Sequence, residues 1–171
     1  FPTVIVAPFP GGFSAWGMLM ADLRHDFSQT DIKLMSDVDT KTANRIFSHL
    51  ERRVKELFEQ ENIRDENIGM TYQMDLRYYG QEHTLTVSAP SKLADADKGM
   101  LEESFDELHL KVYGHNAPEE LKEIVSLKVI GIGKVRKPVL QTIGRGGETP
   151  AAQSKLGKRK VYLGEGGYQE F

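Results

Sequence analysis

The stretch at residues 7–26, APFPGGFSAWGMLMADLRHD, is the part of the chain best suited to bind an anion. A short apolar run ends in prolines and in Gly11 and Gly12, and Ser14 then stands where its hydroxyl could cap a helix. Free backbone N–H groups at a helix N-terminus, together with the helix dipole, attract phosphate. A glycine pair with a serine cap is also typical of an ordinary tight turn. Gly11, Gly12 and Ser14 are therefore candidate cofactor-binding residues, with a plain strand-to-helix turn as the alternative.

Other chemistry-bearing patterns are missing from the sequence. It has no P-loop, no G-x-G-x-x-G after a strand and no G-x-S-x-G, and the absence of cysteine excludes disulfides and thiolate nucleophiles. The five histidines do not fall in a zinc-binding spacing, so we expect no metal site. From the residues alone, no active site can be assembled.

Composition narrows the class of protein. The 171 residues are 39% hydrophobic and 27% charged with a net charge of −3, which is ordinary for a folded globular protein. No apolar run reaches membrane-spanning length, and the charge balance argues against nucleic-acid binding. The basic segment at 154–160 is interpreted as a solvated strand or turn. We expect a cytoplasmic protein, and because the chain starts directly in a strand-like run, a fragment of a longer polypeptide.

Periodicity predicts the elements that would position these residues. A buried strand is expected at 4–7, a helix from Ser14 to about Arg24, and an extended segment to about residue 35. Apolar steps of three and four predict amphipathic helices at 40–61 and 95–113. Alternation predicts a hairpin at 68–88, and further strands are expected at 121–135 and 158–163, with a loop at 142–157. The predicted fold class is α+β: an antiparallel sheet with both long helices on one face.

Four stretches, in order, resemble the hydantoinase A/5-oxoprolinase family. The string P-x-P-G-G-F-S-A-W-G-M-L-M-A-D-L-R-H-D is similar to the family pattern P-x-x-P-G-V-x-S-A-x-G-x-x-x-A-D-x-R-H-D, although Gly12 stands where the family usually has an aliphatic residue. DLRYYGQEHTLTV at 75–87, the F-x-x-x-H-x-x-x-Y-G pattern that ends at Gly114, and EIVSLKV at 123–129 also match. The resemblance covers most of the chain from Pro8 to Val129.

The resemblance implies both an architecture and an activity. Residues 1–24 would be the last strand and helix of an actin-like ATPase domain, and 25–171 the family's C-terminal α+β domain. The chain would be the C-terminal part of an ATP-dependent N-methylhydantoinase A-type subunit. Such an enzyme opens hydantoin or 5-oxoproline through a phosphorylated amide. Related members carboxylate ketones, and a stand-alone binding or scaffold module is a further alternative.

The resemblance also implies partners, cofactors and site candidates. ATP and Mg would belong to the missing N-terminal half, and a B-type subunit would be the partner, with a small cyclic amide as substrate and neither nucleic acid nor membrane. This chain alone would be non-catalytic and would shape the cleft or dock the partner. The candidate catalytic residues come from the matched motifs, each with a structural role as its alternative: Arg24, His25, Arg77, Gln81, His109 and Tyr113. Arg24, for example, could simply pair with Asp22 or Asp26.

Overall fold

The computed structural model describes residues 3–7, 9–139, 144, 149, 152–154 and 157–170. The chain divides into two compact units, Phe1–Pro138 and Val139–Phe171, each of which is described by itself. The loop predicted at 142–157 lies largely outside the described residues.

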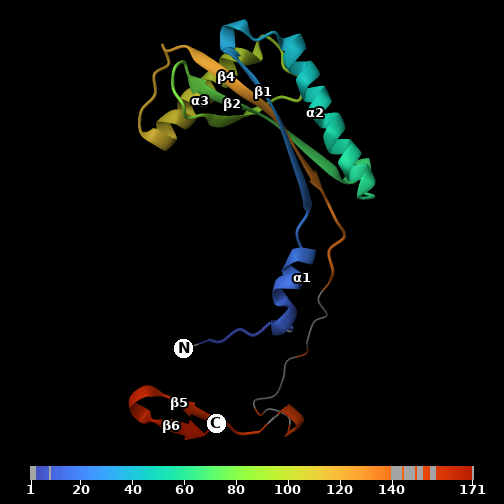
Figure 1. The fold of residues 1–171 in the computed structure, drawn as a ribbon, viewed down its shortest axis with the longest axis vertical. Helices are drawn as coiled ribbons and strands as arrows, with labels where there is room; N and C mark the ends of the chain where they lie inside the picture. Colours follow the sequence, from blue (N-terminus) through green and yellow to red (C-terminus); the bar gives the residue numbers. More distant parts are fainter. Residues whose placement is uncertain are drawn as a thin grey trace. The chain divides into compact units, whose positions relative to one another are not determined.

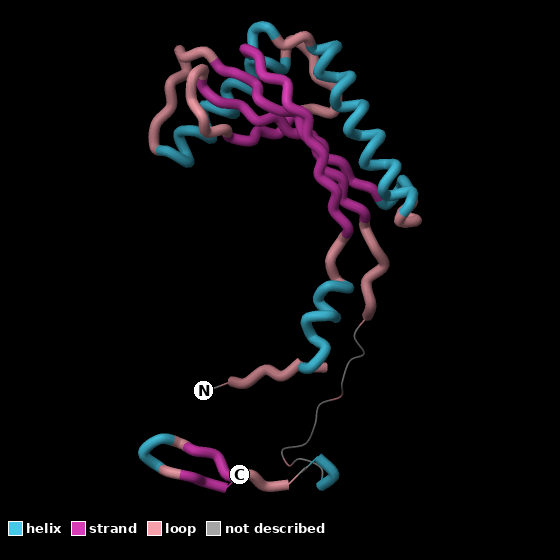
Figure 2. Tube along the Cα trace, viewed as in Figure 1, coloured by secondary structure: helices cyan, strands magenta, loops and turns pink. Residues whose placement is uncertain are grey.

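The first unit is built on a four-stranded antiparallel sheet (Figures 1 and 2). Its strands are β1 (Leu23–Leu34), β2 (Ile68–Tyr78), β3 (Leu85–Ala89) and β4 (Lys122–Gly133), in the order β1-β4-β2-β3. The predicted hairpin is confirmed as β2 and β3, with Leu76 opposite Leu85. The extended segment after residue 24 forms most of β1, which is an edge strand of this sheet.

Two long helices, α2 (Thr40–Gln60) and α3 (Asp97–Tyr113), cover one face of the sheet. On α2, Phe47 meets Tyr72 edge-on with a ring-centroid distance of 5.4 Å, and on α3, Phe105 meets Tyr78 at 4.9 Å. Because Tyr72 and Tyr78 are separated by an even number of positions on β2, they lie on the same face of the sheet. The predicted α+β class, with both helices on one face, is confirmed. The largest fully buried core side chains include Phe47, Phe58, Phe105, Leu50, Met74, Leu76, Leu101 and Leu127.

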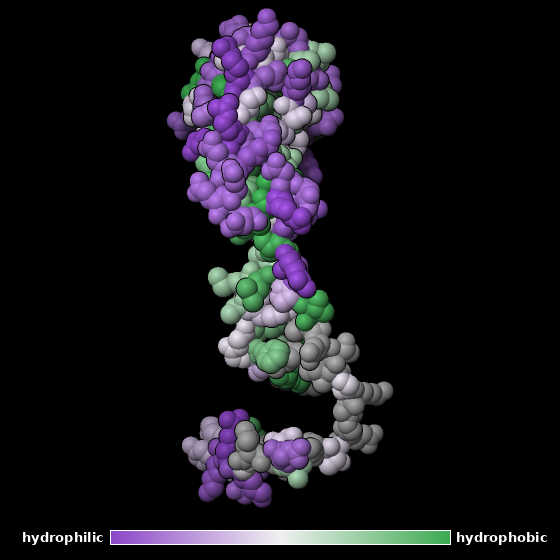
Figure 3. Space-filling view, turned by 90° about the vertical axis from the view of Figure 1, so that its right-hand side faces the viewer, coloured by the Kyte–Doolittle hydropathy of each residue, from purple (hydrophilic) through white to green (hydrophobic). Residues whose placement is uncertain are grey.

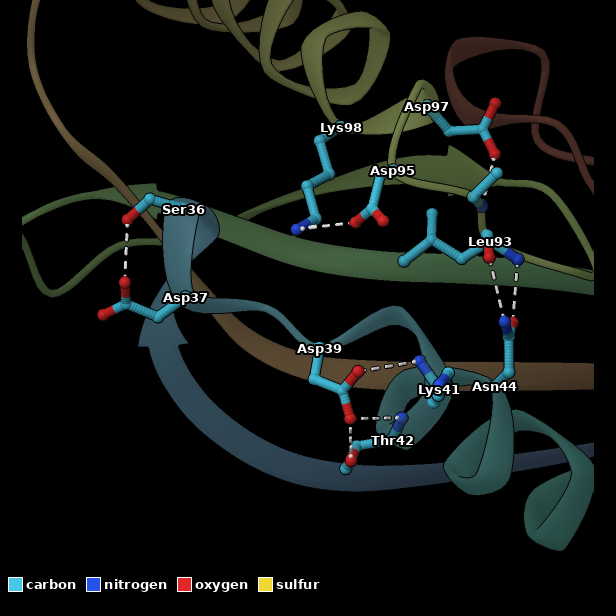
Figure 4. Close-up of polar contacts among 11 residues, drawn as sticks. Ser36, Asp37, Asp39, Lys41, Thr42, Asn44, Leu93, Asp95, Asp97 and Lys98 are labelled. Atoms are coloured by element: carbon cyan, nitrogen blue, oxygen red, sulfur yellow. Dashed lines mark hydrogen bonds and ion pairs between the residues drawn. The ribbon is translucent and has the colours of Figure 1, made fainter.

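Polar contacts tie the start of α2 to the loop that precedes α3 (Figure 4). Asp39 caps α2 by accepting hydrogen bonds from the backbone N–H groups of Lys41 and Thr42 at 3.2 and 3.1 Å. One turn further on, the Asn44 amide donates to the Leu93 carbonyl at 2.9 Å and accepts from its N–H at 2.8 Å. The two helices are therefore held together at this end by hydrogen bonds as well as by packing.

The N-terminal segment differs from the prediction in three ways. Helix α1 spans only Phe13–Leu19, so the expected end near Arg24 is wrong, and Arg24 lies in β1. Gly12 occupies the N-cap position, and no side chain caps the helix, so Ser14 is a residue within α1 and does not cap it. Residues 3–7 form no strand, because no described residue pairs with their backbone groups.

Apolar side chains of this segment are exposed. Ile5 is 90% exposed and Met18 78%, and Figure 3 shows apolar side chains gathered over the part of the chain that carries α1. The buried strand predicted at 4–7 is therefore not observed in this chain. Exposed patches of this kind mark contact sites in other proteins.

The second unit contains a short hairpin of β5 (Lys160–Tyr162) and β6 (Tyr168–Glu170). The strand expected at 158–163 therefore exists in part, but it pairs with β6, and its assignment to the main sheet is wrong. Glycines allow the tight connection, since Gly164 and Gly167 both have positive φ. Within the described residues, no helix is long and apolar enough to cross a membrane.

Candidate functional site

The sheet face opposite the helices carries both arginine candidates, Arg24 and Arg77. We call it the polar sheet face. His25 packs against Phe58 of α2 with a centroid distance of 4.8 Å, so its neighbours Arg24 and Asp26 point to the opposite face. The same alternation places polar residues of the other strands on that face. Its charged residues are Arg24, Asp26, Asp75, Arg77, Glu123 and Lys128.

Asp75 is the centre of a hydrogen-bond network on the polar sheet face. It lies opposite Ser126 on β4 and Thr86 on β3, and both hydroxyls donate to its carboxylate. Lys128 Nζ lies 2.8 Å from Asp75 Oδ1 and 2.7 Å from Oδ2. Burial alone would raise the pKa of the Asp75 carboxyl, but the bonds from Lys128, Ser126 and Thr86 outweigh burial and lower that pKa. The network therefore holds a charged carboxylate in place and links three strands.

Replacing Asp75 by asparagine is expected to lower the free energy of unfolding by about 2 kcal/mol at pH 7. The lowered pKa of Asp75 means that its stabilisation is complete above the unfolded value of about 3.9 and is lost as the pH falls through the folded value. The difference in the free energy of unfolding between wild type and Asp75→Asn should thus shrink below about pH 4. Urea unfolding at several pH values measures it.

The matched control for this prediction is Asp26→Asn. Asp26 pairs with Arg24 at 2.8 Å, but both side chains are more than half exposed, so we expect no measurable change. A stability difference between wild type and Asp75→Asn that stays constant down to pH 2 would contradict the assignment.

The two arginine candidates are engaged in ion pairs. Arg77 Nε donates to Glu123 Oε2 at 2.8 Å across β2 and β4, and Glu123 is buried. Arg24 donates to Asp26 through two nitrogens, which confirms one of its two expected partners. Asp22 instead accepts from Lys137 and from the Val135 backbone. Both arginines therefore have carboxylate partners within the chain.

His109 and Tyr113 lie at the C-terminal end of α3. His109 is buried, and its Nδ1 lies 2.6 Å from the His115 carbonyl oxygen, so Nδ1 carries the proton and donates it. The Tyr113 ring packs on His109 with a centroid distance of 4.7 Å. Gly114 ends the helix with φ of 79°, a conformation that favours glycine. The F-x-x-x-H-x-x-x-Y-G pattern therefore encodes a helix end and the turn after it.

A buried polar cluster beside His109 was not predicted from the sequence. Tyr78 donates its hydroxyl to Asp106 Oδ1 at 2.6 Å and accepts from the Ala117 N–H at 2.7 Å. Lys122 Nζ lies 3.0 Å from Asp106 Oδ2 and donates to the Pro118 carbonyl at 2.8 Å. Burial, with the nearby Asp106, raises the pKa of Tyr78 to about 12, so its hydroxyl stays a donor at neutral pH.

The remaining candidates lie elsewhere in the fold. His25 Nε2 lies 2.9 Å from Glu61 Oε2 beside the end of α2, and Gln81 is exposed in the turn after β2. A Cβ added at Gly11 or Gly12 would meet open space, and residues 9–20 contain no lysine or arginine that could pair with a phosphate. Their role in binding a cofactor stays a prediction.

The candidates do not converge on one place. His25 is opposite Gly131 on β4, whereas Tyr78, the neighbour of His109, is opposite Lys122. At about 3.3 Å per residue, these two points are about 30 Å apart along β4. Across the part of the chain that the structure describes, no group of three His, Asp or Glu residues could hold a metal ion. The geometry therefore supports internal stabilisation and offers no assembled catalytic centre among these residues.

The chain is similar in sequence to a known domain family and to several known proteins. The hydantoinase/oxoprolinase C-terminal domain family matches residues 30–170. An uncharacterized protein of Methanocaldococcus jannaschii is 32% identical over 165 residues, which is 96% of this chain and 22% of that protein. The acetone carboxylase beta subunit of Xanthobacter autotrophicus is 27% identical over 95% of this chain and 24% of its own length. The caprolactamase subunit alpha of Pseudomonas jessenii is 26% identical over 79% and 20%, respectively.

Two solved structures share the fold. Nucleotide-free acetone carboxylase gives a TM-score of 0.75 at 22% identity, covering 99% of this chain and 26% of that one. The ATP-dependent caprolactamase from Pseudomonas jessenii gives a TM-score of 0.70 at 24% identity, covering 84% and 21%. The chain spans about a quarter or less of the length of the curated relatives described above.

Proposed function

The chain belongs to the hydantoinase/oxoprolinase family, whose C-terminal domain it carries, and we propose that it is a non-catalytic part of an ATP-dependent enzyme subunit that opens a cyclic amide. The substrate would be a hydantoin or 5-oxoproline, activated by phosphorylation of the amide oxygen so that water can break the ring C–N bond. In this role the domain shapes the cleft or docks a partner subunit. We place the enzyme in the cytoplasm, where ATP is available.

One observation carries the non-catalytic role: side chains of the matched motifs are occupied by contacts within the chain. Arg77 pairs with the buried Glu123, and His109 donates its Nδ1 proton to a backbone carbonyl. The Nδ1 bond leaves Nε2 of His109 as an acceptor, but His109 is only 4% exposed, and a general base must come within hydrogen-bond reach of its substrate. Neither Arg77 nor His109 lies in an assembled catalytic centre with the other candidates.

ATP and Mg are proposed to bind outside this chain. The turn at Gly11 and Gly12 leads into α1, which is only seven residues long and contains no basic side chain. These residues do not fit a triphosphate, so no step is assigned to them. The exposed apolar side chains at 4–6 and on α1 support the proposal that the segment before β1 packs into an upstream actin-like ATPase domain, whereas Leu23 and Arg24, which the prediction included in that segment, lie in β1.

A second function, carboxylation of a ketone, is favoured by a specific observation. The acetone carboxylase beta subunit matches 95% of the chain, and the acetone carboxylase structure covers 99% of it. Both reactions would use the same phosphoryl activation, so the domain would have the same supporting role. That two relatives are named as subunits supports a B-type partner subunit.

The proposed role predicts that the 171-residue chain alone has no turnover with ATP and Mg on hydantoin, 5-oxoproline, caprolactam, or acetone with bicarbonate. ADP release and ring-opened or carboxylated product would be measured. The positive control is the longer polypeptide that contains this domain, mixed with its partner subunit, and its preferred substrate separates ring opening from carboxylation.

Turnover by the isolated chain at about 1 s⁻¹ or faster, within the usual enzyme range, would contradict the non-catalytic role. If the chain is instead encoded with no ATPase region upstream, the stand-alone binding or scaffold function replaces the proposal.

A further inference from the structure

Strand β3 is a free edge of the sheet. It spans five residues and pairs with β2 on one side, and no described residue pairs with it on the other. Every second residue of such a strand directs its N–H and C=O groups away from the sheet, where they can pair with another chain. β3 therefore offers a short row of unpaired backbone groups.

The composition of β3 offers little protection of the edge beyond its short length and the Pro90 that follows it. Its sequence, LTVSA, has no charged residue and no proline inside it. Natural edge strands are commonly blocked by lysine, proline or a bulge, because an open edge invites pairing with other chains. The other edge, β1, has such protection: it carries Arg24, Asp26, Asp31 and Lys33, and its register shifts between Thr30 and Lys33. Of the two edges, that of β3 is therefore the more open to pairing with another strand.

A groove runs beside this edge. A cavity of about 390 Å³ is lined by residues 86–88 of β3 and by Ser104, Glu107, Leu108 and Lys111 of α3. Consecutive strand residues point to opposite faces, so a cavity that all three line must lie at the outer edge of β3. The four α3 residues are spaced as i, i+3, i+4 and i+7, which makes them one face of the helix. An open edge strand with a helix beside it is an arrangement that can accept an added strand.

We propose that the edge of β3 binds an extended segment of a separate polypeptide as a fifth strand, with alternate side chains in the groove against α3. The groove specifies the chemistry of this segment. Glu107 and Lys111 are exposed and lie about 6 Å apart along the helix axis. Residues i and i+2 of a strand are about 6.7 Å apart on one face. A basic residue and an acidic residue two positions apart in the bound segment would therefore match the spacing of Glu107 and Lys111.

The charges also exclude a second copy of β3 as the occupant. A second β3 would bring only uncharged residues to Glu107 and Lys111. The apolar part of the groove, Val87 and Leu108, fits a small β-branched side chain. The occupant is thus a different segment, with alternating β-branched and charged residues. This docking site does not depend on which reaction the full enzyme catalyses.

The test uses the 171-residue chain and a capped heptapeptide of threonine and valine with lysine at its third and glutamate at its fifth position. NMR amide shifts and hydrogen exchange would locate binding, and fluorescence anisotropy would give the affinity. We expect saturable binding with protection confined to β3. A peptide N-methylated at the amides that face β3 should bind at least about tenfold more weakly, because it cannot donate to the strand.

A charge swap supplies the specificity control. In the double variant Glu107→Lys with Lys111→Glu, both sites are on the surface, so the fold should be kept. The variant should reverse the preference between this peptide and one with lysine and glutamate exchanged, by about fivefold or more.

Four results would overturn the proposal. They are protection at β1, equal affinity for the N-methylated peptide, no response to the charge swap, and no binding at about 1 mM peptide. Sedimentation of the chain alone is the last check. A dimer that dissociates on Thr86→Lys would make the occupant a second copy and would also overturn it.

Discussion

Replacement of Gly131 by alanine is expected to lower the free energy of unfolding by about 3 kcal/mol. Gly131 lies in β4 directly under α2. An added Cβ would overlap Val54 Cγ1 and lie 2.7 Å from Phe58 Cε2, and both of these side chains are fully buried. Phe58 has no room to move, because it also packs on Gly133 and on the His25 ring. The glycine therefore sets how closely α2 approaches the sheet.

The matched control is Gly69→Ala in β2. The nearest atom to a Cβ at Gly69 is the Ile132 carbonyl oxygen at 3.9 Å, which is ordinary contact. The free energy of unfolding of this variant should equal that of wild type or be slightly higher, because alanine has less backbone freedom to lose on folding. Urea unfolding followed by circular dichroism measures both variants. If the free energies of unfolding of Gly131→Ala and Gly69→Ala differ by less than about 0.5 kcal/mol, Gly131 does not set how closely α2 approaches the sheet.

Elements with a strong local pattern were predictable from the sequence. The helix expected at 40–61 is α2 at Thr40–Gln60, because its apolar residues recur at steps of three and four over its whole length. The alternation from Met70 to Tyr78 identified β2 and the side chains that point to the helices. In both cases one face is buried against the core, so burial reinforces the local periodicity.

Elements that depend on distant partners were not predictable. Arg24 was expected near the end of a helix, but pairing with Ile132 on β4 places it in a strand. Residues 3–7 have strand-like side chains, yet a strand needs a neighbour to accept its hydrogen bonds, and no described residue does so. The strand at β5 pairs with β6 for the same reason: pairing is decided by contacts that a local pattern does not contain.

In the candidate site, too, residues in a local motif could be found from the sequence, whereas contacts between distant residues could not. The matched motif makes His109 and Tyr113 candidate catalytic residues, which stays a prediction, and only the structure shows that they hold the end of α3. The cluster of Tyr78, Asp106 and Lys122 was missed, since its members come from β2, α3 and β4. The positions of the two charged residues could have indicated that both are buried. Asp106 follows the buried Phe105, and Lys122 is the first residue of the largely buried strand β4. A charged residue at a buried position calls for a partner of opposite charge.

That buried pair gives the prediction with the largest expected effect. Lys122→Met should lower the free energy of unfolding by about 3 to 5 kcal/mol, because it leaves the Asp106 carboxylate buried without a cation. The double variant Lys122→Met with Asp106→Asn removes both charges, and the asparagine oxygen can still accept from Tyr78. We therefore expect the double variant to be more stable than the sum of the single losses by about 2 kcal/mol.

The comparison pair lies on α2, where Lys55 meets Glu51 at 2.7 Å with side chains that are 49% and 31% exposed. Lys55→Met should lower the free energy of unfolding by about 0.5 kcal/mol or less, because water still reaches the partly exposed Glu51 carboxylate and screens its charge. The four variants and wild type would be compared by urea unfolding at one pH. Strict additivity of Lys122→Met and Asp106→Asn would mean that Lys122 stabilises the domain only through its packing and its bond to the Pro118 carbonyl. A loss of stability that is large for Lys122→Met and small for Lys55→Met would show that burial, and not the ion pair as such, makes the charge at Asp106 depend on its partner.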